Sequence, residues 1–186
     1  EATLVIEGLE DAEGLAALQA GLCSPFDVSG AARHSGRSLL RVEGMAGSVA
    51  YRTDRLRALV GGAVTVAEGE ASAALWRDVR DVTPFAGAAG EVWRIATLPG
   101  AAHDVVLRCG GGEAIWDWGG GLIWLRCAPG RAADVRAAVA GRGHATLVRG
   151  DGAAVFPPEA PEVAALVAGL KARFDPRNIL NRGMMG

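Results

Sequence analysis

The chain has 186 residues, of which half are hydrophobic and 22% are charged, and its net charge is −2. This composition suits a globular protein with its own core, and the charge gives no basis for binding nucleic acid or an anionic membrane. No apolar run approaches the ~20 residues that span a bilayer, and the opening residues show no signal-peptide pattern.

The order of elements over residues 3–67 is β-α-β-β-α-β, the split βαβ or ferredoxin-like unit. Apolar residues at helical spacing predict its helices, and Ser35–Gly36 predicts the turn of its central hairpin. The pattern predicts strands at 3–7, 25–34, 37–44 and 63–68, and helices at 11–22 and 46–60.

A connecting helix at 69–82 follows, and the same order of elements returns over residues 91–149. Strands are predicted at 92–98, 113–118, 122–127 and 144–149 and a helix at 131–141, while 101–109 could be helical or extended. The fold class is therefore α+β. We expect a duplicated ferredoxin-like antiparallel sheet over residues 1–150, with helices mainly on one face and the other face bare.

Residues 151–186 are expected to form a separate C-terminal helix and tail. Apolar residues recur at i, i+3, i+4, i+7 and i+11 from Val163 to Phe174, which is the pattern of an amphipathic helix. Pro176 disfavours helical backbone at Asp175, so the helix should end there. The remaining tail is too short to form another element.

The bare face is where a functional surface is expected, and side-chain alternation predicts which residues occupy it. A three-residue turn at Gly119–Gly121 would place Trp116 opposite Trp124 and Trp118 opposite Leu122. This set of Trp116, Trp118, Trp124 and Arg126 predicts an interface that a partner, domain or ligand covers. The alternative is that these tryptophans are ordinary core residues.

Two arginines are candidate substrate-binding residues. If Trp93 and Ile95 face the helices, Arg94 lies on the bare face, and Arg80 could act near it from the end of the connecting helix. The planar guanidinium suits carboxylate recognition. The alternative for each is a solvated surface arginine.

The sequence shows no self-contained catalytic machinery, and no catalytic residue is assigned. Three separated cysteines and three separated histidines argue against a disulfide framework and against a metal site, and they suit a reducing, cytoplasmic setting. The two Gly-Gly-Gly runs lack the spacing of a phosphate-binding loop.

Several motifs nevertheless resemble a known family. The C-terminal stretch is similar to the closing signature of FAD-linked oxidases of the vanillyl-alcohol-oxidase type, although Arg182 and Met184 replace its usual proline and basic residue. The matching residues are Phe174, Asp175, Pro176, Asn178, Ile179, Leu180, Asn181 and Gly183. The stretches "ALWRDVRDVTPF", "VWRIATLP", "IWDWGGGLIWLR" and "GRGHATLVRG" resemble, in the same order, the later half of the FAD-binding subunit of bacterial glycolate oxidase.

This resemblance implies a role and a set of partners. Residues 1–150 would be a cap or substrate domain with halves at about 3–67 and 91–149, and 151–186 would return to an FAD-binding domain expected before Glu1. FAD would be the cofactor of the full-length protein and not of this chain alone, with Asn178 and Asn181 near the flavin. A second flavoprotein subunit and an iron–sulfur subunit would be partners, and any membrane association would run through them.

Three functional hypotheses follow. In the first, the chain is part of an FAD-dependent oxidase or dehydrogenase of glycolate or a related small 2-hydroxy acid, inactive by itself, with Arg94 and Arg80 holding the substrate carboxylate. In the second, it belongs to a non-catalytic electron-transfer or assembly subunit of the glycolate oxidase complex. In the third, it is an unrelated ferredoxin-like ligand-binding module.

Overall fold

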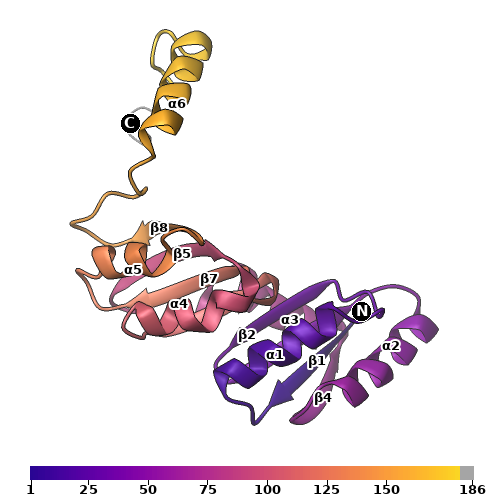
Figure 1. The fold of residues 1–186 in the computed structure, drawn as a ribbon. Coiled ribbons are helices and arrows are strands. Elements are labelled where there is room, and N and C mark those ends of the chain that lie inside the picture. Colours follow the sequence, from indigo (N-terminus) through magenta and orange to yellow (C-terminus); the bar gives the residue numbers. More distant parts are fainter. Residues whose placement is uncertain (181–186) are drawn as a thin grey trace.

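A computed structural model describes residues 1–180, which form an eight-stranded antiparallel sheet, helices on both of its faces, and a C-terminal helix that stands apart (Figure 1). The strands are β1 (Ala2–Glu7), β2 (Gly30–His34), β3 (Arg37–Val42), β4 (Ala63–Glu68), β5 (Glu91–Thr97), β6 (Glu113–Asp117), β7 (Leu122–Cys127) and β8 (Gly143–Arg149). The α-helices are α1 (Asp11–Leu22), α2 (Ala46–Leu59), α3 (Gly69–Arg80), α4 (Ala102–Arg108), α5 (Ala132–Val139) and α6 (Pro161–Phe174). Short 3₁₀ turns are η1 (Thr83–Phe85), η2 (Pro99–Ala101) and η3 (Trp118–Gly120).

The sheet consists of two ferredoxin-like halves joined edge to edge. The strand order β4-β1-β3-β2-β6-β7-β5-β8 repeats the same local arrangement on the two sides of the β2–β6 contact. The predicted α+β fold class and its duplicated antiparallel sheet are confirmed, and the uncertain segment at 101–109 is the helix α4.

One face of the sheet carries the main core. Helices α1, α2, α4 and α5 cover this face, and their apolar residues pack with strand residues such as Leu4, Leu40, Trp93 and Ile95 into one cluster. Trp93 and Ile95 are fully buried there, as the alternation in this strand predicts. Arg94, between them, therefore points to the opposite face.

The opposite face is less bare than the sequence predicts. Helix α3 packs Leu75, Trp76 and Val79 against Val5 and other residues of the N-terminal half. Phe85 of η1 packs on Val92 and Ile115 of the C-terminal half. An open region remains beside α3, where the two halves meet.

The predicted register of the β6–β7 hairpin is wrong by one residue. Asp117, and not Trp118, pairs with Leu122, so Trp116 pairs with Ile123 and Ile115 with Trp124. The connection has four residues, 118–121, of which the first three form η3. Because side chains alternate, the shift moves every β6 side chain to the other face. Trp116 is consequently 3% exposed in the helix-covered core, and it does not share a face with Trp124.

A buried arginine stabilises β2, the strand of the first half that pairs with the second half. Arg33 of β2, 1% exposed, lies in the only register pair between β2 and β6 within the described residues, opposite Trp116. Its guanidinium donates to Asp11 Oδ1 at 2.9 Å, to the Leu9 carbonyl at 2.7 Å and to Ser38 Oγ at 3.0 Å. These bonds tie the loop and start of α1 to the strand that carries the junction.

We expect Arg33→Met to lower the free energy of unfolding by about 3 kcal/mol, because a methionine leaves the three acceptors without their charged donor. Urea denaturation followed by circular dichroism measures the loss. The matched control is Arg57→Met. Arg57 is an exposed residue of α2, and its guanidinium lies 4.0 Å from Asp54. We expect this substitution to change the free energy of unfolding by under about 0.5 kcal/mol. Equal effects of the two substitutions would show that the Arg33 network is not structurally important.

Candidate functional site

The open region beside α3 holds a cavity of about 690 Å³. This volume lies within the range of small-molecule sites, about 300–1,000 Å³. Both halves of the sheet and the connecting helix contribute to its walls. The lining residues are Glu1, Arg41, Ala73, Trp76, Arg77, Val79, Arg80, Arg94, Asp117, Trp118, Leu122 and Trp124.

Helix α3 forms one wall because residues at i, i+3, i+4 and i+7 share a face. Ala73, Trp76, Arg77 and Arg80 have this spacing and all line the cavity. The Trp76 indole N–H donates to Thr3 Oγ1 at 2.8 Å, and that hydroxyl is also 2.8 Å from Ser72 Oγ. This pair of hydrogen bonds fixes α3 and its tryptophan to β1.

The opposite wall is built by strands β5 and β7. Arg94 of β5 lies directly across from Trp124 of β7, and both face the cavity. On its other side Arg94 pairs with Thr146 of β8. The guanidinium carbon of Arg94 lies 5.7 Å from the centroid of the Trp118 ring, within cation–π range. Arg94 is thus held over an aromatic surface at the cavity.

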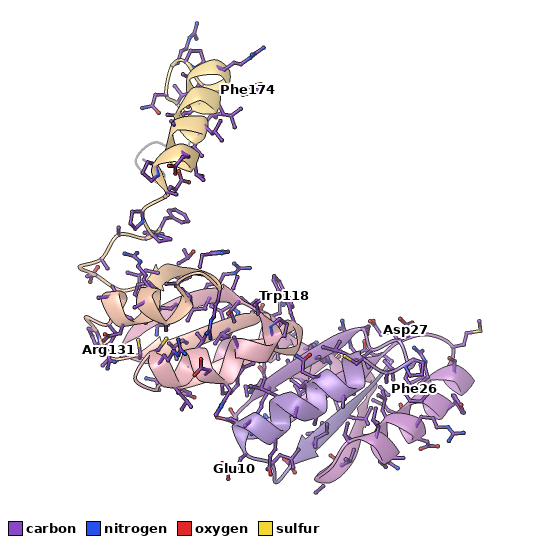
Figure 2. All side chains as sticks on the ribbon, in the orientation of Figure 1. Glu10, Phe26, Asp27, Trp118, Arg131 and Phe174 are labelled. Atoms are coloured by element: carbon purple, nitrogen blue, oxygen red, sulfur yellow. The ribbon has the colours of Figure 1, made fainter. Side chains whose placement is uncertain are left out.

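The turn η3 presents Trp118 at the place where the two halves meet (Figure 2). Trp118 and Gly119 both have left-handed backbone, with φ of 53° and 62°. The Asp117 carboxylate accepts a hydrogen bond from the Trp118 N–H at 2.7 Å, and Gln19 of α1 donates to the Gly119 carbonyl. Held in this way, Trp118 is 59% exposed.

Asp117 and the exposed Glu1 are the two acidic residues among the lining residues of a cavity otherwise rich in arginine. Burial raises the pKa of the Asp117 carboxyl above its usual value, while the hydrogen bond from Trp118 and the charge of Arg41 act in the opposite direction. The side chain is therefore costly to keep ionised, and it is placed where a bound ligand would meet it.

Arginines at the cavity differ in their charge partners. Arg80 Nε and Nη2 are 2.7 and 2.9 Å from the two oxygens of Asp81, and Arg77 pairs with Glu70. Arg41 Nε is 3.4 Å from Glu43. Within residues 1–180, Arg94 forms no ion pair with any carboxylate. The cavity therefore offers one guanidinium whose charge is not neutralised.

Some of the predicted site residues lie at this cavity and others do not. Arg94 and Arg80 both line it, as do Trp118 and Trp124. Trp116 is in the core. Arg126 is not a lining residue; it donates to Glu113 and, at 3.0 Å, to the Ala89 carbonyl, which clamps the segment before β5.

Asn178 belongs to a different feature, the turn that follows α6. The Asp175 carboxylate accepts the Ile179 and Leu180 N–H groups at 2.9 and 3.0 Å, and these bonds lower the pKa of Asp175. Asn178, with left-handed backbone, lines a small hollow beside Lys171. Residues 175–180 thus form a local turn, which the sequence did not predict. Asn181 lies outside the described residues.

Sequence reasoning missed Arg41, Trp76 and Asp117. The α3 spacing of Trp76, Arg77 and Arg80 was a usable signal for one wall. The correct hairpin register would have placed Asp117 on the cavity face. Arg41 had no such signal, because only the packing of α3 over β3 brings it to the cavity, where its guanidinium carbon lies 4.8 Å from the Trp76 ring centroid.

The chain was compared with known proteins by its sequence. No protein-family model matches the chain. Glycolate oxidase subunit GlcE of Escherichia coli strain K12 is 32% identical to it over 163 residues, which are 87% of the chain. The chain is a distant homologue of this subunit. The resemblance inferred from the motifs is thereby confirmed, and the chain spans 42% of the relative's length, less than half.

Two further observations concern membranes and metals. No helix among residues 1–180 is long and apolar enough to cross a membrane. Over the same residues, histidine, cysteine, aspartate and glutamate side chains form no group of three suited to hold a metal ion.

We expect Asp117→Asn to stabilise the protein at pH 7 and to leave its stability unchanged at about pH 3. Asparagine keeps an oxygen acceptor for the Trp118 N–H and removes a charge that burial disfavours. Because the folded-state pKa is raised, wild-type stability falls as the pH rises from the unfolded to the folded pKa. The gain in stability of Asp117→Asn over wild type is therefore present at pH values above the folded-state pKa and absent below the unfolded-state pKa.

Urea unfolding of the two proteins at both pH values measures this effect. Asp104→Asn, which removes a surface carboxylate 3.0 Å from Arg108, is the control and should show no gain at pH 7. A variant that is less stable than wild type at pH 7 would contradict the assignment of Asp117 as a destabilising charge.

Proposed function

We propose that this chain is the cap portion of an FAD-dependent oxidoreductase subunit that oxidises glycolate or a related 2-hydroxy acid. One observation carries the proposal: in a homologue of a glycolate oxidase subunit, Arg94 brings an unneutralised guanidinium to a cavity of small-molecule size. Enzymes that act on hydroxy acids must hold a carboxylate, and a guanidinium does so with two parallel hydrogen bonds.

Arg94 is the residue that binds the substrate carboxylate in this proposal. Its charge persists at any working pH, and the Trp118 ring below it limits the directions in which the guanidinium can point. A carboxylate held in a fixed orientation also fixes the adjacent carbinol carbon, which is the reacting atom. Arg80 lines the edge of the cavity, where its charge is already paired with Asp81.

The flavin is held by another part of the protein. The cavity residues suit a small anion, and neither Gly-Gly-Gly run supplies a phosphate-binding loop for a dinucleotide. FAD, when bound, accepts the hydride from the substrate carbon. This chain's share of the work is to position the acid and to exclude water from it.

Helix α6 and its turn are the proposed contact with the flavin-binding part. Figure 1 shows α6 at the end of an extended segment, away from the sheet. Its apolar stripe is exposed, with Leu166 at 70% and Phe174 at 75%, and no α6 residue is buried among the described residues. Such a surface is typical of a segment that packs on a partner. Asn178 and Asn181 are proposed to lie at this contact.

A second candidate function is assembly or electron transfer without substrate oxidation. The exposed stripe of α6 favours it, because an uncovered apolar helix face is typical of a surface that packs on another protein. In this case a second flavoprotein subunit and an iron–sulfur subunit would be the partners. Homology to a glycolate oxidase subunit argues against the third hypothesis, an unrelated ligand-binding module.

We expect Arg94→Ala to weaken binding of lactate at least tenfold, since it removes a charged pair of hydrogen bonds worth about 2 kcal/mol. Quenching of Trp118 and Trp124 fluorescence reports the binding. Arg57→Ala is the matched control and should bind as wild type does. Equal affinity of the Arg94 variant and wild type would remove Arg94 from the site and would favour the assembly function.

We also expect the purified chain to be colourless and inactive with glycolate, even after incubation with FAD, because the flavin is held elsewhere. Visible absorbance after gel filtration tests for retained flavin, and the complete glycolate oxidase subunit is the positive control. A stoichiometric yellow complex would show that this chain holds the cofactor itself.

A further inference from the structure

The charges around the cavity limit which acids it accepts. Four arginines line it, and three of them already have carboxylate partners: Arg41 with Glu43, Arg77 with Glu70 and Arg80 with Asp81. A ligand carboxylate that approached one of these three would also approach the carboxylate bonded to it. Each such pair is close to neutral and gives a second anion little attraction.

Arg94 stands apart from this pattern. Its cross-strand neighbours are Trp124 and Thr146, which carry no charge, and its guanidinium lies over the Trp118 ring. No carboxylate within residues 1–180 pairs with it. The site therefore offers one strong attraction for a carboxylate, and it lies on the β5 side of the cavity.

Asp117 lies on the β6 side of the same cavity. It pairs with Leu122 of β7, and Leu122 pairs in turn with Ala96, two residues from Arg94 on the same face of β5. Asp117 is thus offset from Arg94 across one intervening strand. A short acid bound to Arg94 through one carboxylate would direct its other end into the space that Asp117 and Arg80 line, and Arg80 is already bonded to Asp81.

We propose that Asp117 and Asp81 are specificity-determining residues that restrict this cavity to 2-hydroxy monocarboxylates by opposing a second carboxylate. Asp117 acts from the β6 wall, and Asp81 acts at the rim by occupying Arg80. The inference rests on the proposed function, since it takes the cavity as the substrate site. It assigns selectivity to two carboxylates rather than to the arginine that binds.

Lactate and malate test the proposal because malate is lactate with one more carboxylate on its methyl carbon. Tryptophan fluorescence titrations at constant ionic strength give the two affinities. We expect wild type to bind lactate at least about tenfold more tightly than malate. The double variant Asp81→Asn/Asp117→Asn should lower this ratio at least fivefold, mainly by strengthening malate binding.

Asp104→Asn, which removes a carboxylate outside the cavity, is the matched control and should keep the wild-type ratio. Circular dichroism verifies that each variant is folded. Equal or tighter binding of malate by wild type, or an unchanged ratio in the double variant, would overturn the assignment of Asp117 and Asp81.

The outcomes also separate this inference from the proposed function. If Arg94→Ala weakens lactate binding but the double variant keeps its selectivity, the substrate site stands and the inference fails. If lactate does not bind to wild type, or if it binds equally well without Arg94, both fail.

Discussion

The contact between β2 and β6 is the constraint on which the rest of the molecule depends. It joins two four-stranded units into one sheet, and in doing so it makes a cavity from residues that neither unit has alone. Arg41 comes from the first unit, Arg94 and Trp124 come from the second, and α3 connects the two. The junction has one register pair within the described residues, so its geometry depends on neighbouring contacts. The bond from Gln19 of α1 to the Gly119 carbonyl of η3 is one such contact across the junction, and the Arg33 network holds β2 in place from within the first unit.

Much of the sheet could be predicted because its pattern is local. Alternation in β5 correctly separates Trp93 and Ile95 from Arg94, and the Ser35–Gly36 turn correctly pairs β2 with β3. The strand order within each half also follows from recognising the repeated unit, whereas the β2–β6 contact that joins the halves does not. These features depend on residues that are close together in the sequence, so the sequence pattern alone is enough to predict them.

The predictions failed for the β6–β7 register, which depends on one turn, and for the cavity, which depends on packing between residues distant in the sequence. Gly119–Gly121 is compatible with a three-residue connection, yet the Asp117 side chain bonds the Trp118 N–H and makes Trp118 part of the turn. With Trp118 in the connection, Asp117 pairs with Leu122, and Trp116 faces the core. The face that α3 covers was not predictable either, because its amphipathic pattern shows that it packs but not where. Arg41 lines the cavity because α3 packs beside it and places Trp76 against its guanidinium.

The Asp175 turn has a consequence for how the C-terminal arm would engage a partner. Since the carboxylate closes the turn on the helix itself, α6 and residues 175–180 are already shaped before any encounter. Binding would then restrict only the extended tether after β8, and little ordering entropy would be lost in the arm. If this preformed arm, α6 with residues 175–180, binds a partner, the tether keeps the sheet at a high local concentration near that partner. In the proposed assembly the arm would add avidity, because it would keep the sheet near the partner that the arm binds.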